Sequence, residues 1–183
     1  MTVAARQARR IQALADDLLL LARFDAAAVA APERVVDLAA LAQDVAADFA
    51  ALGEVSVDDD TRGRARVGGT PVQLERMLRN LVDNATRFAA ARVGISVSTQ
   101  GTTAVIRVQD DGPGIPAADR ERVFERFTRL EDDRSRDTGG SGLGLAIARE
   151  ITERHRGTVR VEASERGARL VVRLPLAGPS IDR

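Results

Sequence analysis

Apolar residues recur every three to four positions in several stretches of the chain, which is the spacing of amphipathic helices. The first of these stretches has its apolar face at Leu38, Leu41, Val45 and Phe49. A longer helix of about 18 residues is predicted from Thr70-Pro71, where Gln73 completes a capping box and proline suits the first helical position. The apolar face of this helix consists of Leu74, Met77, Leu78, Leu81, Val82 and Ala85. A short helix through Val123-Phe124 and another over residues 143–153 complete the helical prediction.

Other stretches alternate apolar and polar residues with a period of two, which predicts strands. One antiparallel hairpin turns at Gln100-Gly101-Thr102, and a second turns near Arg166-Gly167. A third and shorter hairpin is expected to join Val55 and Val57 to residues 64–67. Helices that alternate with antiparallel hairpins predict an α+β fold, a two-layer sandwich whose mixed, mostly antiparallel sheet is covered by helices on one face.

The N-terminal segment has a pattern of its own. Ile11, Leu14, Leu18 and Leu21 recur at alternating steps of three and four, a coiled-coil seam about two heptads long. Such a helix either packs on its own domain or forms half of a helical hairpin or dimer. The alanine-rich stretch that ends at Pro32 is a linker, so we expect a boundary between residues 1–31 and 32–183. No apolar run approaches the roughly 20 residues of a membrane span, and we expect none in this chain.

The charged residues exclude several classes of chemistry. The chain has 27 basic and 27 acidic residues, and every basic residue is an arginine. A P-loop lysine, a Schiff base and a protein-kinase strand lysine are therefore excluded. Without cysteine, and with His155 as the only histidine, neither thiolate chemistry nor a multi-histidine metal site is available. A net charge of zero gives no bulk attraction to nucleic acid, and we expect no nucleic-acid partner.

Two asparagines interrupt the long predicted helix. Asn80 and Asn84 are spaced i,i+4, so their amides project from one side, beside Arg76 and Arg87. Asparagine is a poor residue for the middle of a helix, and two at this spacing need a reason. The polar stripe is either a solvated face or a site for a hard cation, because amide oxygens can ligate Mg²⁺ while triphosphate oxygens supply other positions.

Two glycine-containing segments also carry chemistry. Residues 110–116, with sequence DDGPGIP, follow a predicted strand, and a carboxylate there can accept a hydrogen bond from an exocyclic amine. Residues 139–145, with sequence GGSGLGL, open into a helix, where exposed N–H groups form a cradle for phosphates. Each segment alone can equally be a turn or a linker. The charged stretch over residues 131–137 is predicted to be a mobile lid.

Taken together and in this order, the motifs resemble the catalytic ATP-binding domain of two-component sensor histidine kinases, which has the Bergerat-type ATP-binding fold. Asn80-Leu-Val-Asp-Asn84-Ala is similar to the N box of the family, and Asp110-x-Gly112-x-Gly114 to its G1 box. Phe124-Glu-Arg-Phe127 is similar to the F box, and Gly140-x-Gly142-Leu-Gly144-Leu to the G2 box. The resemblance covers residue 32 to about residue 175, and the N-terminal helix is similar to the second helix of the dimerisation and phosphoacceptor hairpin.

The resemblance implies a role for each matching residue. Asp110 would bond the adenine amine and Phe88 would pack on the ring, while Asn84 and Asn80 would handle Mg²⁺. Arg87 stands where many members carry a phosphate-binding lysine, and Arg129, the catalytic candidate, would reach the γ-phosphate. The remaining ATP-binding candidates of the G1 and G2 boxes are Gly112, Gly114, Ile115, Gly140, Gly142, Leu143, Gly144 and Leu145.

The resemblance also implies partners. The family's phosphoacceptor lies in a His-Glu/Asp motif on the first hairpin helix, and no such helix precedes Ile11. His155 resembles a structural histidine of the family. The chain is therefore expected to phosphorylate a hairpin that it does not contain, with onward transfer to a response regulator. The full-length protein is expected to be a homodimer with this domain in the cytoplasm and the parent anchored in the cell membrane, whereas the fragment can be a monomer.

Two alternatives of the same fold remain. A conformational ATPase would use a glutamate one turn before the metal-binding asparagine, but Asn80 occupies that position and cannot act as a general base. An anti-sigma-type serine kinase or regulator would need no hairpin helix, in contrast to the leucine seam at the N-terminus.

Overall fold

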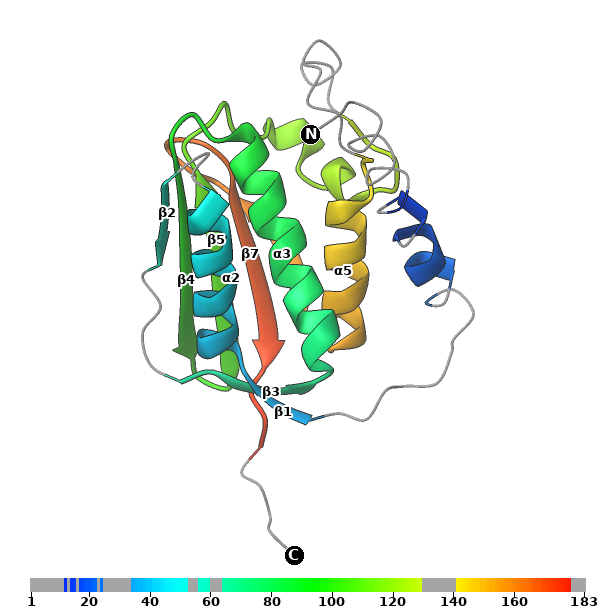
Figure 1. Ribbon diagram of the computed structural model, residues 1–183, viewed down its shortest axis with the longest axis vertical. Helices are drawn as coiled ribbons and strands as arrows, with labels where there is room; N and C mark the ends of the chain where they lie inside the picture. Colours follow the sequence, from blue (N-terminus) through cyan, green and yellow to red (C-terminus); the bar gives the residue numbers. More distant parts are fainter. Residues whose placement is uncertain are drawn as a thin grey trace, which may run out of the picture.

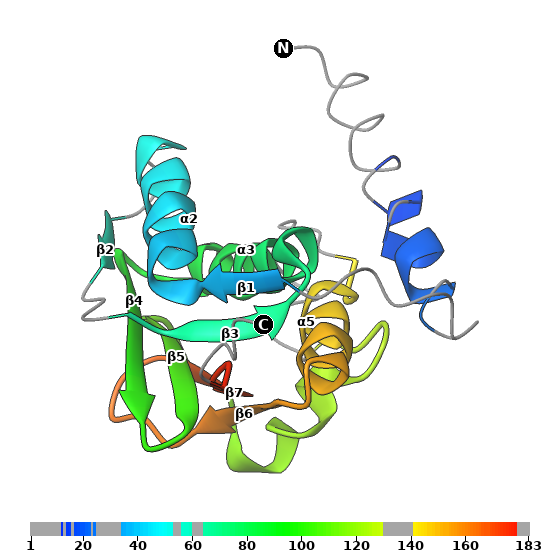
Figure 2. The same ribbon diagram turned by 90° about the horizontal axis from the view of Figure 1, so that it is seen from below.

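A layer of helices covers one face of a five-stranded sheet, as Figures 1 and 2 show. The computed structural model describes residues 12, 14–15, 17–22, 24, 34–52, 56–59, 64–129 and 141–178. Within these residues the α-helices of the covering layer are α2 (Leu38–Leu52), α3 (Pro71–Phe88) and α5 (Gly144–Arg154). Two 3₁₀ turns, η1 (Ala117–Asp119) and η2 (Arg122–Phe124), connect β5 to the region before α5. The predicted α+β sandwich is confirmed.

The main sheet has the strand order β2-β4-β5-β7-β6. Its strands are β2 (Ser56–Asp59), β4 (Arg92–Gln100), β5 (Thr103–Asp110), β6 (Thr158–Glu162) and β7 (Arg169–Pro175). All neighbours are antiparallel except the parallel pair β2 and β4. A separate antiparallel pair, β1 (Arg34–Asp37) and β3 (Arg66–Gly69), lies across the end of the helical layer at the bottom of Figure 1. The sheet is therefore mixed but mostly antiparallel, as predicted.

The core lies between the helices and the facing side of the sheet. The six apolar positions predicted for α3 are all at most 1% exposed, and Val93, Ile95 and Val97 of β4 are equally buried. On β5, Ala104, Ile106 and Val108 face the same side and are buried too. Alternation along a strand thus places the next residues, including Gln109, on the other face of the sheet. Both predicted hairpins, β4–β5 and β6–β7, are confirmed.

The predicted hairpin between residues 55–57 and 64–67 is wrong. Instead, β2 pairs in parallel with β4, and β3 pairs with β1, a strand that the sequence pattern did not reveal. Strands of four residues contain too few alternating positions to specify a partner. The capping box is not formed either, because Thr70 makes no side-chain cap; its carbonyl accepts the N–H groups of Gln73 and Leu74 instead.

The N-terminal helix packs against its own domain and leaves part of its apolar surface exposed. Leu21 and Phe24 are buried in the main core, whereas Leu18 and Leu19 are 46% and 59% exposed. Of the predicted seam, Leu21 thus faces the domain core and Leu18 is exposed to solvent. Ile11 lies outside the described residues. Both views show this helix beyond α5, to which it is joined by the Arg154 guanidinium 4.5 Å above the Phe24 ring. No helix among the described residues is long and apolar enough to span a membrane.

Candidate functional site

A cleft runs along one side of α3 to the end of β5. It consists of two adjoining hollows of about 640 and 720 Å³, which share the lining residues Asn84, Val123, Thr128 and Leu145. The first hollow contains Asn80 and Gly142, and the second contains Asp110. Three elements that are distant in sequence therefore line two adjoining hollows that share part of their lining.

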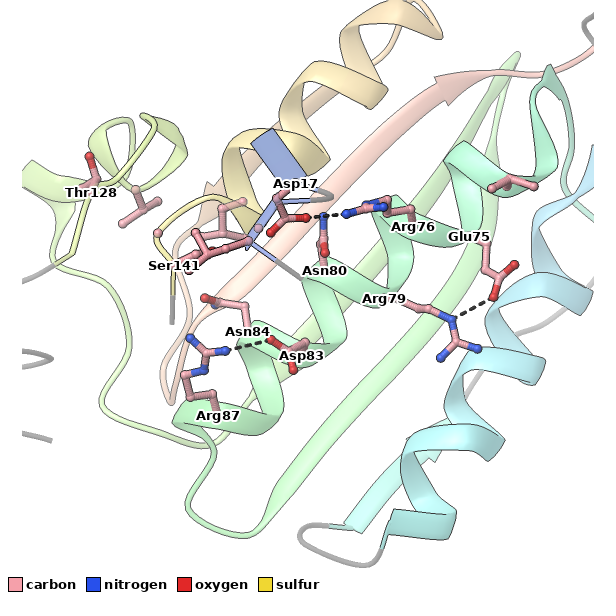
Figure 3. A pocket seen from close by; sticks show the side chains of 16 residues that line it. Asp17, Glu75, Arg76, Arg79, Asn80, Asp83, Asn84, Arg87, Thr128 and Ser141 are labelled. Carbon is pink, nitrogen blue, oxygen red and sulfur yellow. Dashed lines mark hydrogen bonds and ion pairs between the residues drawn. The ribbon is translucent and has the colours of Figure 1, made fainter. Parts of the chain in front are cut away.

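The polar side of α3 lines the first hollow. Asn80, Asn84 and Arg87 point from successive turns of this helix into the space that Figure 3 shows. Asn80 Nδ2 is buried, and among the described residues it has no hydrogen-bond partner. A buried N–H donor without a partner costs free energy, so binding of a hydrogen-bond acceptor at this point would be favourable.

In the part of the chain that the structure describes, every arginine that lines the first hollow is already ion-paired. Arg87 Nη2 lies 3.0 Å from Asp83 Oδ2, one turn away on the same helix. Arg79 Nε donates to Glu75 Oε1 at 2.8 Å and also pairs with Asp48 of α2, and these two partners raise the pKa of Arg79. A fourth ion pair joins Arg76 of α3 to Asp17 of the N-terminal helix, as Figure 3 shows. Any anion that binds one of these arginines must therefore compete with a carboxylate.

The second hollow is built around Asp110, the last residue of β5. Its side chain is 3% exposed, and its Oδ1 accepts the N–H groups of Gly112 at 2.8 Å and Ala168 at 3.1 Å. Burial raises the pKa of Asp110. The N–H groups of Gly112 and Ala168 lower this pKa, and the nearby charge of Asp111 raises it, each with a smaller effect than burial. Because both bonds end on Oδ1, the geometry leaves Oδ2 as the oxygen that could accept a further hydrogen bond.

Gly112 brings the loop after β5 against the end of α3. A Cβ at this position would overlap the carbonyl of Phe88, so no larger residue fits without a shift of the backbone. The contact places Phe88 and Asp110 on the same hollow, and Ile115 and Gly114 line it from the following loop. An apolar ring beside a buried carboxylate is the arrangement expected for a flat heterocycle with an amine.

The start of α5 closes the first hollow at its other end. Gly142 has a φ of 70° and its carbonyl accepts the N–H of Phe127 at 2.9 Å. A Cβ at Gly142 would lie 2.9 Å from the Phe127 backbone, so the F-box and G2 segments meet only because this residue is glycine. Ser141, Gly142 and Gly144 line the hollow at the N-terminus of α5, an end that favours anions.

The structure places most predicted site residues on the cleft. Those on its lining are Asn80, Asn84, Arg87, Phe88, Asp110, Gly114, Ile115, Arg129, Gly142, Gly144 and Leu145. Gly112 adjoins the lining through its bond to Asp110, whereas Leu143 is buried in the core. Gly140 lies outside the described residues, as does the charged stretch predicted to be a lid.

Sequence reasoning missed two parts of the site. The β6–β7 turn lines the second hollow with Ser164, Glu165 and Gly167, and it supplies the Ala168 N–H to Asp110. A backbone donor carries no side-chain signal, and only the Arg166-Gly167 turn marked this segment. The contribution of the N-terminal helix to the site was also missed: its Asp17 lines the first hollow.

The metal-binding capacity of the cleft rests on amides. Among the described residues, no cluster of three or more His, Cys, Asp or Glu side chains is arranged to hold a metal ion. Asn80 and Asn84 offer neutral amide oxygens as ligands, while the unpartnered Asn80 Nδ2 is a hydrogen-bond donor that needs an acceptor such as an anionic oxygen. This donor set suits a hard cation that brings its own anionic oxygens.

Comparisons with known proteins define the class. The family described as "Histidine kinase-, DNA gyrase B-, and HSP90-like ATPase" matches residues 69–178, more than half of the chain. The chain therefore belongs to this ATPase family. Within it, the chain carries a domain of the sensor histidine kinase type, which confirms the resemblance inferred from the four motifs.

Three relatives illustrate the match. The chain is 39% identical over 178 residues to the sensor histidine kinase RppB of Synechocystis sp., covering 93% of this chain and 39% of that protein. It therefore spans about two fifths of the length of this curated relative. The mycobacterial sensor histidine kinase MprB has a TM-score of 0.70 at 28% identity, with 80% of this chain and 99% of that chain covered. The full-length ShkA structure in complex with AMPPNP has a TM-score of 0.77 at 27% identity, covering 92% and 36%.

Proposed function

We propose that this chain binds Mg-ATP in the cleft and transfers the γ-phosphoryl group to a histidine of a dimerisation hairpin. The observation that supports the proposal is the shared lining of the two hollows, because Asn84 lines the first together with Gly142 and the second together with Asp110. One end of such a space suits a base and the other suits phosphates. The related ShkA structure, which is a complex with AMPPNP, supports this assignment.

The adenine ring would occupy the second hollow. Asp110 would accept a hydrogen bond from its exocyclic amine, and the Phe88 side chain would pack on the ring. The carboxylate is held by two backbone donors before any ligand arrives, so little ordering is needed on binding. A buried carboxylate with a directed acceptor oxygen favours a base that carries an amine over one that carries a carbonyl there.

The phosphates would lie in the first hollow, where Asn84 and Asn80 would hold Mg²⁺ together with phosphate oxygens. The metal would neutralise charge on the phosphates during transfer. Arg87 would leave Asp83 to reach a phosphate, and Arg129, on the edge of the second hollow, would contact the γ-phosphate. The N–H groups at the start of α5 would hold the phosphates at the opposite side.

In the transfer step, a bond forms between an imidazole nitrogen of the acceptor and the γ-phosphorus. The bond from this phosphorus to the β,γ-bridging oxygen breaks, so ADP leaves and the imidazole loses its proton. His155 is not the acceptor in this proposal, because its Nε2 accepts the Thr70 N–H at 3.2 Å and its Nδ1 lies 2.7 Å from the Ile151 carbonyl. Both ring nitrogens are thus engaged in holding the end of α5.

The proposal extends to the partners of the parent kinase. Residues 1–31 would belong to the hairpin and residues 32–183 to the catalytic domain. Leu18 and Leu19, exposed on the N-terminal helix, would face the other helix of the hairpin in a homodimer. The phosphohistidine would then pass its group to an aspartate of a response regulator. The domain would work in the cytoplasm, with its parent anchored in the membrane.

Two measurements test the proposal. Equilibrium binding of ATP to the purified chain should be measurable and should tighten in Mg²⁺. Incubation with radiolabelled ATP and a separately purified matched hairpin should give acid-labile, base-stable phosphate on the hairpin, and none when its histidine is replaced by glutamine. Binding of ATP without any transfer to the hairpin would refute the kinase activity and leave a nucleotide-binding regulator.

A further inference from the structure

Asp111, the second residue of the DDGPGIP segment, is not on the lining of either hollow but is extensively hydrogen-bonded. Its Oδ1 accepts three consecutive backbone N–H groups, those of Ala90, Ala91 and Arg92, at 2.9, 2.9 and 3.0 Å. These residues connect the end of α3 to the start of β4. The three donors lower the pKa of Asp111, in contrast to its neighbour Asp110. The Asp111 side chain therefore connects the end of β5 to the segment between α3 and β4.

The bonds of Asp111 fix two cleft residues relative to each other. Asp110 precedes it in the chain, and Phe88 lies two residues before the first of the three donors. The backbone of Gly112 touches the Phe88 carbonyl from the other side of Asp111. The Asp111 side chain thus holds the Asp110 carboxylate and the Phe88 ring in their relative positions, although it belongs to neither residue.

A weaker set of contacts joins the same strand end to the β6–β7 turn. Arg166 Nη2 lies 3.4 Å from Asp111 Oδ2, and the Arg166 side chain is 73% exposed. Gln109 Nε2 donates to Ser164 Oγ at 3.1 Å and to the Arg166 carbonyl at 3.3 Å. This turn carries the Ala168 N–H that binds Asp110. Because the Gln109 contacts hold the turn independently, the exposed Arg166 pair is expected to matter little.

We infer that Asp111 is a positioning residue for adenine recognition: it sets the geometry between Asp110 and Phe88 and so determines the affinity for the base without touching the nucleotide. The inference rests on the proposed function. Binding sites depend on side chains that are held in place before the ligand arrives, and a loosened support raises the ordering cost of binding. The effect should be confined to the base end of the cleft, because none of the three N–H groups belongs to the phosphate end.

The experiment compares Asp111→Ala, Asp111→Asn and Arg166→Ala with the wild type. The dissociation constants of ATP and ADP are measured with and without Mg²⁺, at a temperature well below the thermal midpoint of each variant. We expect Asp111→Ala to weaken ATP and ADP binding equally, by about tenfold, since three charge-assisted bonds are lost. The Asn amide oxygen can still accept the same N–H groups, so Asp111→Asn should remain within about threefold of the wild type. Arg166→Ala should remain within about twofold.

The pattern separates positioning from a general loss of stability. The ratio of ATP affinities with and without Mg²⁺ should be the same in Asp111→Ala as in the wild type. The conservative variant Asp111→Asn should restore the affinity for ATP and ADP to near the wild-type value. If Asp111→Ala does not fold, Asp111→Ser, which retains an oxygen acceptor, should show an intermediate loss of about fivefold.

Wild-type affinity in folded Asp111→Ala, or in Asp111→Ser where it stands in for the alanine variant, would overturn the inference alone. A loss for ATP but not ADP, or an equal loss in Asp111→Asn and Asp111→Ala, would overturn it as well. Failure of the wild type to bind ATP would instead refute the proposed function, and the inference with it.

Discussion

The two ends of the cleft differ in how their polar groups are satisfied. In the second hollow, the proposed base end, the Asp110 carboxylate is held by the backbone N–H groups of Gly112 and Ala168. In the first hollow, the proposed phosphate end, Arg87 and Arg76 are each paired with a carboxylate, and Asn80 Nδ2 has no partner among the described residues. One end is already in the form that a ligand needs, whereas the other must exchange partners.

The difference assigns separate tasks to the two ends. A rigid base site contributes affinity because little is reorganised on binding, as preorganisation requires. A phosphate site whose arginines begin in ion pairs gains less from each arginine contact, because that contact replaces an existing ion pair. Variants at the base end should therefore change affinity most, and variants at the phosphate end should change the response to Mg²⁺ and to the number of phosphates.

The largest effect is expected for Asp110→Asn. The amide oxygen can keep the two backbone donors, but the NH₂ group then faces the adenine amine, and donor meets donor. Loss of a charge-assisted bond together with this mismatch should weaken ATP binding by about 100-fold. Calorimetric titration in Mg²⁺ checks this value. Retention of wild-type affinity would place the base elsewhere.

The same variant should not lose stability at neutral pH. Burial raises the pKa of Asp110, so the folded protein holds its proton more tightly than the unfolded chain. The contribution of Asp110 to wild-type stability therefore falls as the pH rises from the ordinary carboxyl range through the raised value, and it is constant above that. Asp110→Asn lacks this titration, so its thermal midpoint minus that of the wild type should increase with pH across this window. A difference that decreases with pH would contradict the assigned shift.

An intermediate effect is expected for Asn84→Ala. The loss should appear mainly in the presence of Mg²⁺, at about tenfold, because the variant removes an amide oxygen proposed to bind the metal. Binding measured in EDTA should change by less than about threefold. An equal loss in both conditions would show that Asn84 contacts the nucleotide rather than the metal.

A smaller effect is expected for Arg87→Ala, matched with Arg79→Ala. Both arginines line the first hollow and pair with a carboxylate one turn away. Arg79 is also paired with Asp48 of α2 and should stay there. Arg87→Ala should weaken ATP binding by about fivefold and AMP binding by less than about twofold, whereas Arg79→Ala should affect neither. An equal loss in the two variants would mean that only the local charge matters.

The smallest effect is expected for Asp17→Asn. Asp17 places a negative charge on the lining of the first hollow, where it pairs with Arg76. Its removal should tighten ATP binding, by up to about threefold, because a partly exposed ion pair contributes little. The dissociation constant of ATP at low ionic strength measures this change. Weaker binding would show instead that the docked helix supports the site.

Sequence periodicity predicted the elements that have long buried faces. The helix α3 and the β4–β5 hairpin present many apolar positions at a regular spacing, so their pattern could be read directly. The four-residue strands β1, β2 and β3 contain too few positions to specify their partners, and their pairing depends on tertiary packing. The N-terminal seam has the same limit, because its spacing does not tell whether Leu21 packs on the domain or on another helix.

The candidate site was predictable where side chains carry the chemistry. Asn84 and Asp110 stand out by residue type and context, whereas the Ala168 N–H is a backbone donor that any residue except proline supplies. The ion pair of Arg76 with Asp17 joins positions that are 59 residues apart, and nothing in the local pattern links them. Contacts of this kind follow from the fold rather than from any motif.

Titration of ¹⁵N-labelled chain with AMPPNP and Mg²⁺, followed by amide chemical shifts, tests most directly whether one nucleotide occupies the whole cleft. Shifts at Gly112, Ala168, Asn84 and Gly142 should follow one binding curve and saturate at one equivalent. If the shifts at Gly112 and Ala168 saturate while those at Asn84 and Gly142 do not move, the two hollows do not form a single ATP site.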